Sequence, residues 1–299
     1  MNSDSAFYIG STHDVCQDFS LSGKISKDNI LYSIVADGCS SSLYSSIGAR
    51  ILSFSAQKEL NKIYRNNAGF FDFQDDICIE RSRSSISSLN IPVECLDSTL
   101  ITACSEEYET NIDMKGDGVV AIGLLNGDIL IISVEFPSGY PYYMNYLPSY
   151  SKRYNIWAEA NNECLVKMSI ILSNGEYKIL EKECGDHYAY ATWDHPHRYI
   201  FASPTEYGVE IEIEGQRKNI GKYIVIMSDG IKSFYEPTDN GTSRVNKPID
   251  YHDVIYKILD FKNFNGQFMQ RRLNKFLKQC TKFGWYHYDD ISFGAIYLE

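Results

Sequence analysis

The stretch Ile224-Val225-Ile226-Met227-Ser228-Asp229-Gly230 predicts a buried strand that ends at a carboxylate. An unbroken apolar run is typical of such a strand. Gly230 then lets the backbone turn directly after Asp229. Because a carboxylate at the end of a buried strand is unfavourable without a partner, the stretch predicts that something compensates the charge of Asp229.

The same construction occurs at two other places in the chain. The apolar run 31–36 leads into Asp37-Gly38, and Asp289-Asp290 precedes the strand-like run 291–298. Each aspartate taken alone is more typical of a turn or a helix N-cap than of a metal ligand. Three such strand ends, far apart in the sequence, together favour a carboxylate-lined metal site.

Composition and charge are those of an acidic globular protein. The 299 residues are 44 % apolar and 22 % charged, with a net charge of −11. Basic residues occur only in short runs such as Arg271-Arg272, which argues against nucleic acid and anionic membranes as partners. No apolar run approaches the roughly 18–20 residues that span a membrane. The N-terminal residues lack the pattern of a signal peptide, and we expect a cytoplasmic protein.

The eight cysteines predict free thiols and no disulfide framework. None of them forms a C-x-x-C pair, and a chain of this length can bury enough core without disulfides. This agrees with a reducing cytoplasm. The sequence Asn240-Gly241-Thr242 matches a glycosylation acceptor, but we expect no glycosylation in that compartment.

Hydrophobic periodicity predicts both helices and strands. Helices are expected over residues 43–65, 72–90, 251–260 and 266–282. Strands are expected over residues 6–9, 19–25, 31–36, 98–104, 118–125, 128–134, 165–172, 176–182, 224–228 and 291–298. The elements come in blocks and do not alternate strictly, which favours an α+β fold with an antiparallel sheet core.

We expect residues 1–299 to form one domain with variable surface insertions at about 137–163 and 183–221. The first insertion is rich in tyrosine and proline. The second contains His187, His195 and His197. His195 and His197 are more typical of a solvated loop than of a metal or phosphate site. Residues 236–248 are rich in Pro, Asp, Asn and Gly and predict a loop.

Acidic motifs follow one another in an order that spans nearly the whole chain. They are Cys16-Gln17-Asp18, Val35-Ala36-Asp37-Gly38, Asp97-Ser98-Thr99-Leu100, Gly116-Asp117-Gly118, Met227-Ser228-Asp229-Gly230 and Asp289-Asp290-Ile291-Ser292. A lone Asp-Gly is a weak signal, but the ordered set resembles the metal-dependent protein phosphatase family, type 2C. The resemblance implies a central antiparallel β-sandwich flanked by helices on both sides, in four layers α-β-β-α. It also implies a binuclear Mn²⁺ or Mg²⁺ site at one end of the sandwich.

The resemblance implies a role for each acidic position. Asp37 would bridge both metal ions, and Gly38 would offer its backbone carbonyl to one of them. Asp229 and Asp289 would hold the first metal, and Asp18 would act through ordered water. Asp117 would hold a weaker third metal together with Asp229. Asp290 would follow the ligand Asp289 in the sequence without itself binding a metal ion.

The residue types agree with such a site. Hard divalent cations prefer oxygen ligands, and the sequence has no His/Cys cluster with zinc spacing. Two such ions can lower the pKa of a shared water, which then attacks phosphorus in line. A phospho-enzyme is then unnecessary, and we expect Cys16 and Cys39 to have packing roles.

Three positions depart from the family pattern. Eukaryotic members carry an arginine that holds the phosphate, and by spacing His13 stands at that position. His13 is equally compatible with a catalytic phosphate contact, beside Asp37 and Asp229, and with a loop role. Cys39 stands where members have His or Met, and the third-metal segment reads Gly-Asp-Gly. With these departures, the sequence resembles a divergent bacterial branch of the family.

The leading hypothesis is a Mn²⁺- or Mg²⁺-dependent phosphatase of phosphoserine and phosphothreonine in proteins, acting in signal transduction. Family logic pairs such an enzyme with a cognate Ser/Thr kinase. The first alternative is a catalytically weak pseudophosphatase that binds a phosphoprotein or kinase, which the weak phosphate position at His13 motivates. The second alternative is a metal-dependent phosphohydrolase of a small molecule.

Overall fold

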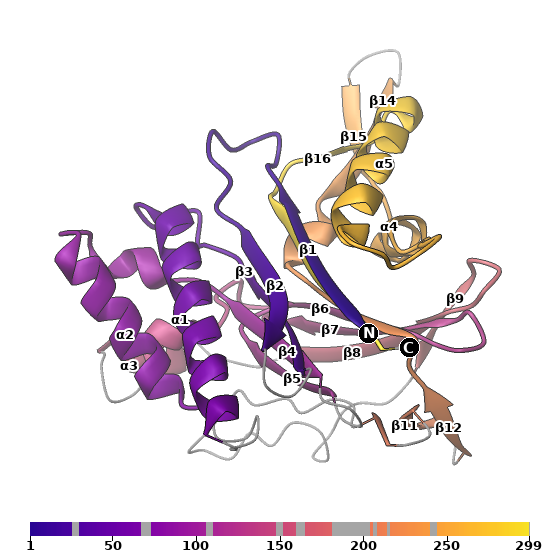
Figure 1. The fold of residues 1–299 in the computed structure, drawn as a ribbon. Helices are drawn as coiled ribbons and strands as arrows, with labels where there is room; N and C mark the ends of the chain where they lie inside the picture. The colour runs from indigo at the N-terminus through magenta and orange to yellow at the C-terminus, as the bar shows by residue number, and fades with distance from the viewer. Residues whose placement is uncertain are drawn as a thin grey trace.

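The computed structural model has four layers, with helices on the outer faces of two packed antiparallel sheets (Figure 1). It describes residues 1–25, 30–66, 73–105, 110–147, 152–159, 165–180, 204–205, 208–213, 216–239 and 244–298. The fold is α+β, and the predicted helix-flanked sandwich is confirmed.

The two large sheets are antiparallel at every strand pair. Among the described residues, the larger sheet has the strand order β1-β17-β13-β6-β7-β8-β9. Its strands are β1 (Asn2–Tyr8), β6 (Gly118–Gly123), β7 (Ile129–Glu135), β8 (Leu165–Ile171), β9 (Tyr177–Leu180), β13 (Tyr223–Met227) and β17 (Ile291–Tyr297). The smaller sheet contains β2 (Phe19–Ile25), β3 (Ile30–Ala36), β4 (Leu100–Ser105) and β5 (Thr110–Lys115), in that order.

The four helices predicted from periodicity are confirmed. On the smaller sheet lie α1 (Ser45–Arg65) and α2 (Asp75–Ser88), and on the larger sheet lie α4 (Tyr251–Ile258) and α5 (Phe268–Phe283) (Figure 1). The remaining helical segments are α3 (Lys152–Glu159) and the 3₁₀ turns η2 (Val93–Leu96), η3 (Met144–Tyr146) and η4 (Asp229–Lys232). No helix in the described part of the chain combines the length and apolar character needed to cross a membrane.

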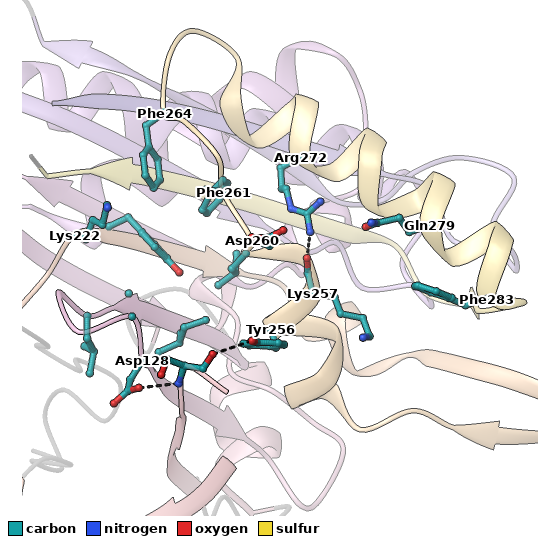
Figure 2. Close-up of a pocket in the computed structure, with 17 residues that line it drawn as sticks. Asp128, Lys222, Tyr256, Lys257, Asp260, Phe261, Phe264, Arg272, Gln279 and Phe283 are labelled. Atoms are coloured by element: carbon teal, nitrogen blue, oxygen red, sulfur yellow. Dashed lines mark hydrogen bonds between the residues drawn. The ribbon is translucent and has the colours of Figure 1, made fainter. Parts of the chain in front are cut away.

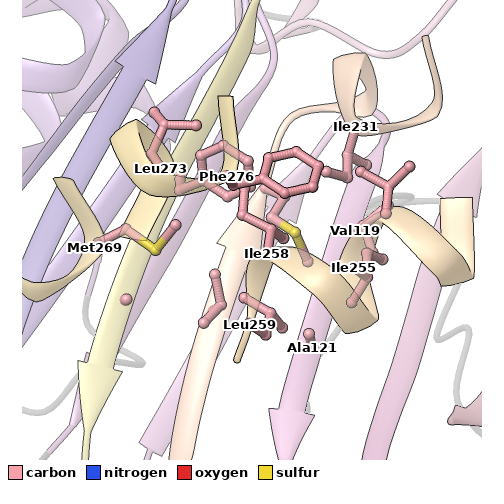
Figure 3. Close-up of a cluster of buried hydrophobic side chains, with 14 of the residues drawn as sticks. Val119, Ala121, Ile231, Ile255, Ile258, Leu259, Met269, Leu273 and Phe276 are labelled. Atoms are coloured by element: carbon pink, nitrogen blue, oxygen red, sulfur yellow. The ribbon is translucent and has the colours of Figure 1, made fainter. Parts of the chain in front are cut away.

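The strands of the larger sheet supply two cores at once. In β13, Ile224 and Ile226 face the smaller sheet, whereas Val225 and Met227 face α4 and α5. Figure 3 shows the second of these cores, in which Leu273 and Phe276 of α5 pack with residues of β6 and α4. Because β13 is buried on both faces, its sequence is apolar at every position and does not alternate.

Two small three-stranded sheets complete the described fold. They contain β10 (Pro204–Thr205), β11 (Gly208–Ile213) and β12 (Gln216–Ile220), and β14 (Phe234–Asp239), β15 (Arg244–Pro248) and β16 (Tyr286–His287). The predicted loop over 236–248 is therefore wrong. Its prolines are tolerated because β15 is an edge strand and β14 pairs with β16 only through Phe234 and Tyr235.

Hydrophobic periodicity also gives no sign of β5. This strand carries Asp113 and Lys115 in an otherwise buried segment, and the two side chains form an ion pair. Buried charges that pair with each other remove the apolar pattern on which strand prediction depends. His195, His197 and the Asn240-Gly241-Thr242 motif lie outside the described residues.

Close packing at Gly48 gives a stability test of the layer formed by α1. A Cβ added at this buried position would lie 1.7 Å from the carbonyl oxygen of Cys95. Gly→Ala in a helix normally stabilises, by about 0.5–1 kcal/mol. Here we expect Gly48→Ala to lower the free energy of unfolding by about 1–3 kcal/mol, measured by urea denaturation. Lys58→Ala, on the exposed face of the same helix, is the control and should change it by less than about 0.5 kcal/mol.

Candidate metal centre

The aspartates predicted for the site meet at one end of the sandwich. Asp37 directly follows β3, Asp18 directly precedes β2, and Asp117 directly precedes β6. Asp229 follows β13 after one residue, and Asp289 precedes β17. In an antiparallel sheet the end of one strand lies beside the start of its neighbours. The pairing of β2 with β3, and of β6 and β17 with β13, therefore gathers segments that are distant in the sequence.

A cavity of about 410 Å³ lies at this end of the molecule. The structure brings five of the six predicted metal-site residues to its wall: Asp37, Gly38, Asp117, Asp229 and Asp289. Asp18 and His13 do not line the cavity. The lining contains no lysine or arginine among the described residues, and its charged groups are all acidic.

Backbone hydrogen bonds fix the position of Asp37. Its carbonyl accepts from the Ser98 hydroxyl at 2.8 Å and from the Thr99 N–H at 2.9 Å. Its own N–H donates to Thr99 Oγ1 at 3.2 Å, and Gly38 pairs with Ser98 in an isolated β-bridge. The Asp97-Ser98-Thr99 motif thus holds the end of β3 in place.

Asp229 begins the turn η4, and the glycine after it makes a close approach possible. A Cβ at Gly230 would lie 1.7 Å from the carbonyl oxygen of Asp290. Next to it, Ser228 N–H donates to the Ser292 carbonyl at 3.1 Å, and Ser292 N–H donates to Ser228 Oγ at 3.0 Å. These contacts hold the segment of Asp229 against the segment of Asp289.

Asp18 lies behind the cavity, against Asp37. Its side chain is buried, and Oδ2 has no hydrogen-bond partner among the described residues. The carboxyl is within hydrogen-bonding reach of Asp37 and of the Ser228 hydroxyl. Burial raises the pKa of Asp18 to about 7, although these hydrogen bonds oppose the shift.

Three further carboxyls of the site, those of Asp37, Asp117 and Asp289, are also unfavourable in their charged form. Burial raises the pKa of Asp37 well above its usual value, and the charges of Asp18, Asp229 and Asp289 add to the effect. The pKa of Asp117 rises to about 7, from burial and then from Asp229. The pKa of Asp289 is raised by burial and by Asp229. The fold therefore concentrates negative charge at this cavity, and the charge of Lys232 offsets only part of it at Asp117.

The residues present fit divalent cations. The donors are carboxylate and carbonyl oxygens, which hard cations such as Mn²⁺ and Mg²⁺ prefer, and the unpartnered Asp18 Oδ2 is a buried acceptor without a donor. In the described part of the chain, no three His, Cys, Asp or Glu side chains surround one point as a ready-made ion-binding group. The aspartates instead occupy the wall of a shared cavity.

Asp290 ties the loop after β1 to the start of β17. Its Oδ1 accepts from the Gly10 N–H at 2.6 Å and its Oδ2 from the Gln17 N–H at 2.5 Å. His13 of the same loop places Nδ1 3.0 Å from Asp290 Oδ2 and Nε2 3.9 Å from Asp289 Oδ1. Asp290 is buried, and both of its oxygens are used by this loop. His13 faces the two acids in this structure.

The cavity also has walls that the motif analysis did not assign. Tyr140, Tyr143 and Tyr146 line it from the segment before α3. Asp97 lines it as well, and its carboxylate accepts from Asn145 Nδ2 at 2.9 Å, which fastens this segment to η2. In the sequence, the abundance of tyrosine after residue 137 is the only indication of this wall. Composition alone does not predict that these tyrosines face the cavity.

A family model described as Protein phosphatase 2C matches residues 10–278. The chain belongs to the protein phosphatase 2C family. No curated protein matches it.

Solved structures of bacterial phosphatases are similar in fold. A mutant of a bacterial serine phosphatase has a TM-score of 0.50 at 11 % identity, over 100 % of this chain and 99 % of that chain. A serine/threonine phosphatase of S. agalactiae has a TM-score of 0.42 at 13 % identity, over 100 % and 99 %. A Ser-Thr phosphatase of Mycobacterium smegmatis has a TM-score of 0.41 at 13 % identity, also over 100 % and 99 %. At such identities the likeness concerns the fold alone.

The adjacent acids Asp289 and Asp290 should differ in how much stability the same substitution costs. Asp290→Asn replaces one of the two oxygens that accept from the Gly10 and Gln17 N–H groups by an NH2 donor. One N–H group then loses its acceptor, and we expect the free energy of unfolding to fall by about 1–3 kcal/mol. Asp289→Asn removes a carboxylate whose charged form is disfavoured, and we expect no loss of stability. Urea denaturation in EDTA measures both. Equal losses in the two variants would contradict the assignment of Asp290 as the structural acid.

Asp18 makes the stability of the metal-free protein depend on pH. Burial raises its pKa from 3.8 to about 7. A carboxyl with a raised folded pKa contributes stability below its unfolded pKa, and this contribution is lost as the pH rises through the folded pKa. We therefore expect the difference in unfolding free energy between wild type and Asp18→Asn to change between about pH 4 and pH 7, to the disadvantage of wild type at the higher pH. Asp14→Asn, in the exposed part of the same loop, should show no such change.

Proposed function

We propose that the chain is a Mn²⁺- or Mg²⁺-dependent protein phosphatase that hydrolyses phosphoserine and phosphothreonine. The observation that carries the proposal is the convergence of Asp37, Asp117, Asp229 and Asp289 on one cavity in a member of this family. Asp37, Gly38, Asp229 and Asp289 would hold two ions, with Asp18 behind them, and Asp117 with Asp229 would hold a third.

Bound cations would supply an activated water for in-line attack and would offset the charge of the phosphoryl group. The chain's own residues provide the geometry for this. Ser98 and Thr99 fix the backbone of Asp37. The serine pair Ser228 and Ser292 holds the loop of Asp229 against β17. None of these roles requires a covalent intermediate on a side chain.

The wall of the cavity suits a phosphorylated side chain on a larger partner. Tyr140 is 65 % exposed, so it is available to contact a peptide that enters the cavity. Because no lysine or arginine lines the cavity among the described residues, attraction of the phosphate depends on the bound cations. We infer a phosphoprotein substrate, a cognate Ser/Thr kinase as the opposing activity, a cytoplasmic location and a single catalytic domain.

One observation favours a second candidate function. His13, which stands where eukaryotic members carry the phosphate-binding arginine, contacts Asp290 and Asp289 and does not line the cavity. A site with weak phosphate affinity fits a pseudophosphatase that binds a phosphoprotein or kinase without turnover. The two candidates differ in whether phosphate is released.

Phosphate release from a phosphothreonine peptide, with Mn²⁺ titrated in and EDTA as a control, tests the proposal. We expect metal-dependent turnover in wild type and a loss of about 100-fold or more in Asp229→Asn, because this residue holds cations that act in the transition state. Asp14→Asn is the matched control, since it makes the same change on an exposed loop residue, and it should keep full activity.

Three results would count against the phosphatase proposal. A folded wild type that binds Mn²⁺ without turnover would favour the binding module. A wild type that binds no Mn²⁺ would overturn the assignment of the centre. Turnover of nucleotides in preference to phosphopeptides would favour a small-molecule phosphohydrolase.

A further inference from the structure

A second cavity, of about 620 Å³, lies at the opposite end of the strands that carry the metal centre. Strand β6 begins at Gly118, beside Asp117, and ends at Gly123 on this second cavity. Strand β13 begins here at Tyr223 and ends at Met227, just before Asp229. The two cavities are therefore separate, with the length of β13 between them.

One wall of the second cavity is aromatic. The rings of Phe261 and Phe264 are 5.0 Å apart, and Tyr223 lies 5.3 Å from the first and 5.6 Å from the second. Figure 2 shows Phe261 and Phe264 side by side, next to the space that Asp260 and Arg272 enter. Such a wall suits a planar apolar group.

Arg272 projects from α5 toward the same space (Figure 2). Its side chain is 6 % exposed, and one nitrogen, Nη2, donates to the carbonyl of Lys257 near the end of α4. Nε and Nη1 have no hydrogen-bond partner among the described residues. Burial lowers the pKa of the guanidinium. Buried donors without acceptors are unfavourable. The hydrogen bond to α4 uses only Nη2 and leaves the other two nitrogens of the guanidinium without a role.

The acids of this cavity are already engaged. Asp128 accepts from the Ser173 N–H at 2.8 Å and from Asn126 Nδ2 at 2.8 Å. Asp260 Oδ1 accepts from Lys262 Nζ at 2.8 Å, and the charge of Asp260 also acts on Arg272 without a hydrogen bond to it. Two lysines also line the cavity, namely Lys222 and Lys257, and Nζ of Lys257 lies 5.7 Å from the ring centres of Phe283 and Trp285. The lining thus carries three cations and two paired acids, in a protein whose net charge is −11.

We propose that this cavity binds a small organic phosphate that carries an aromatic ring, of the size of a nucleoside monophosphate. The phosphate would accept from the free N–H groups of Arg272, with Lys222 and Lys257 adding charge. The ring would lie against Phe261, Phe264 and Tyr223. The volume is within the range of sites that enclose one small ligand. This site is independent of the proposed phosphatase activity.

Isothermal titration calorimetry of the full chain with AMP tests the proposal, with adenosine and inorganic phosphate as partial probes. EDTA is present throughout so that AMP does not bind through cations at the other cavity. We expect AMP to bind more tightly than either partial probe. We also expect about tenfold or more weaker binding of AMP to Arg272→Gln, because a charge-assisted contact is lost, and weaker binding to Lys222→Gln.

The control is Arg271→Gln, which removes the same charge from the neighbouring residue. Arg271 is exposed and donates to Asn263 and Asn265 outside the cavity, so AMP binding should be unchanged. Asp229→Asn should also leave it unchanged. If Arg272→Gln does not fold by circular dichroism, Lys222→Gln decides.

Four results would overturn the proposal. The first is no binding of AMP to wild type at millimolar concentration. The second is unchanged AMP affinity in Lys222→Gln and in folded Arg272→Gln. The third is adenosine binding as tightly as AMP, which would remove the role of the anion. The fourth is inorganic phosphate binding as tightly as AMP, which would remove the role of the ring.

Discussion

Repulsion among carboxylates that are buried or half-buried at one end of the sandwich is the constraint on which the rest of this structure depends. Asp18, Asp37, Asp229 and Asp289 influence one another strongly enough that burial and mutual charge raise the pKa of Asp37 well above its usual value. No single segment holds them together. The antiparallel register of two sheets brings them to one end. The Ser98 hydroxyl and the N–H groups of Thr99 and Ser292 donate the hydrogen bonds that keep them there. Three hydrophobic cores on and between the sheets supply the stability against which this repulsion acts.

Much of this arrangement could be predicted from the sequence because the responsible patterns are local. The apolar run before Asp229 and the glycine after it predict a buried strand and a sharp turn, and both are present. The order of the acidic motifs predicts the family, which is confirmed. The convergence of the acids on one cavity agrees with the predicted site, whose occupation by metal ions stays a prediction.

The features that escaped prediction depend on contacts between distant segments. Asp290 follows a predicted ligand in sequence, yet it accepts from Gly10 and Gln17, more than 270 positions away. The tyrosine wall of the cavity depends on Asn145 contacting Asp97. Strand β5 is hidden because its buried Lys115 is paired with acids. In each case a polar residue acquires its role from a partner that no local window contains.

The pairing of β1 with β17 has a consequence for how the protein folds during translation. Residues 2–8 lie alongside residues 291–297, and Asp290 reaches back to the loop that follows β1. During synthesis β1 emerges from the ribosome long before β17 is made. Until then, the backbone N–H and C=O groups that β1 later pairs with β17 remain unpaired. The carboxylates that the two sheets carry at one end of the sandwich are complete only when β17, with Asp289 before it, is added. The cavity is therefore incomplete until residues 289–297 have been translated.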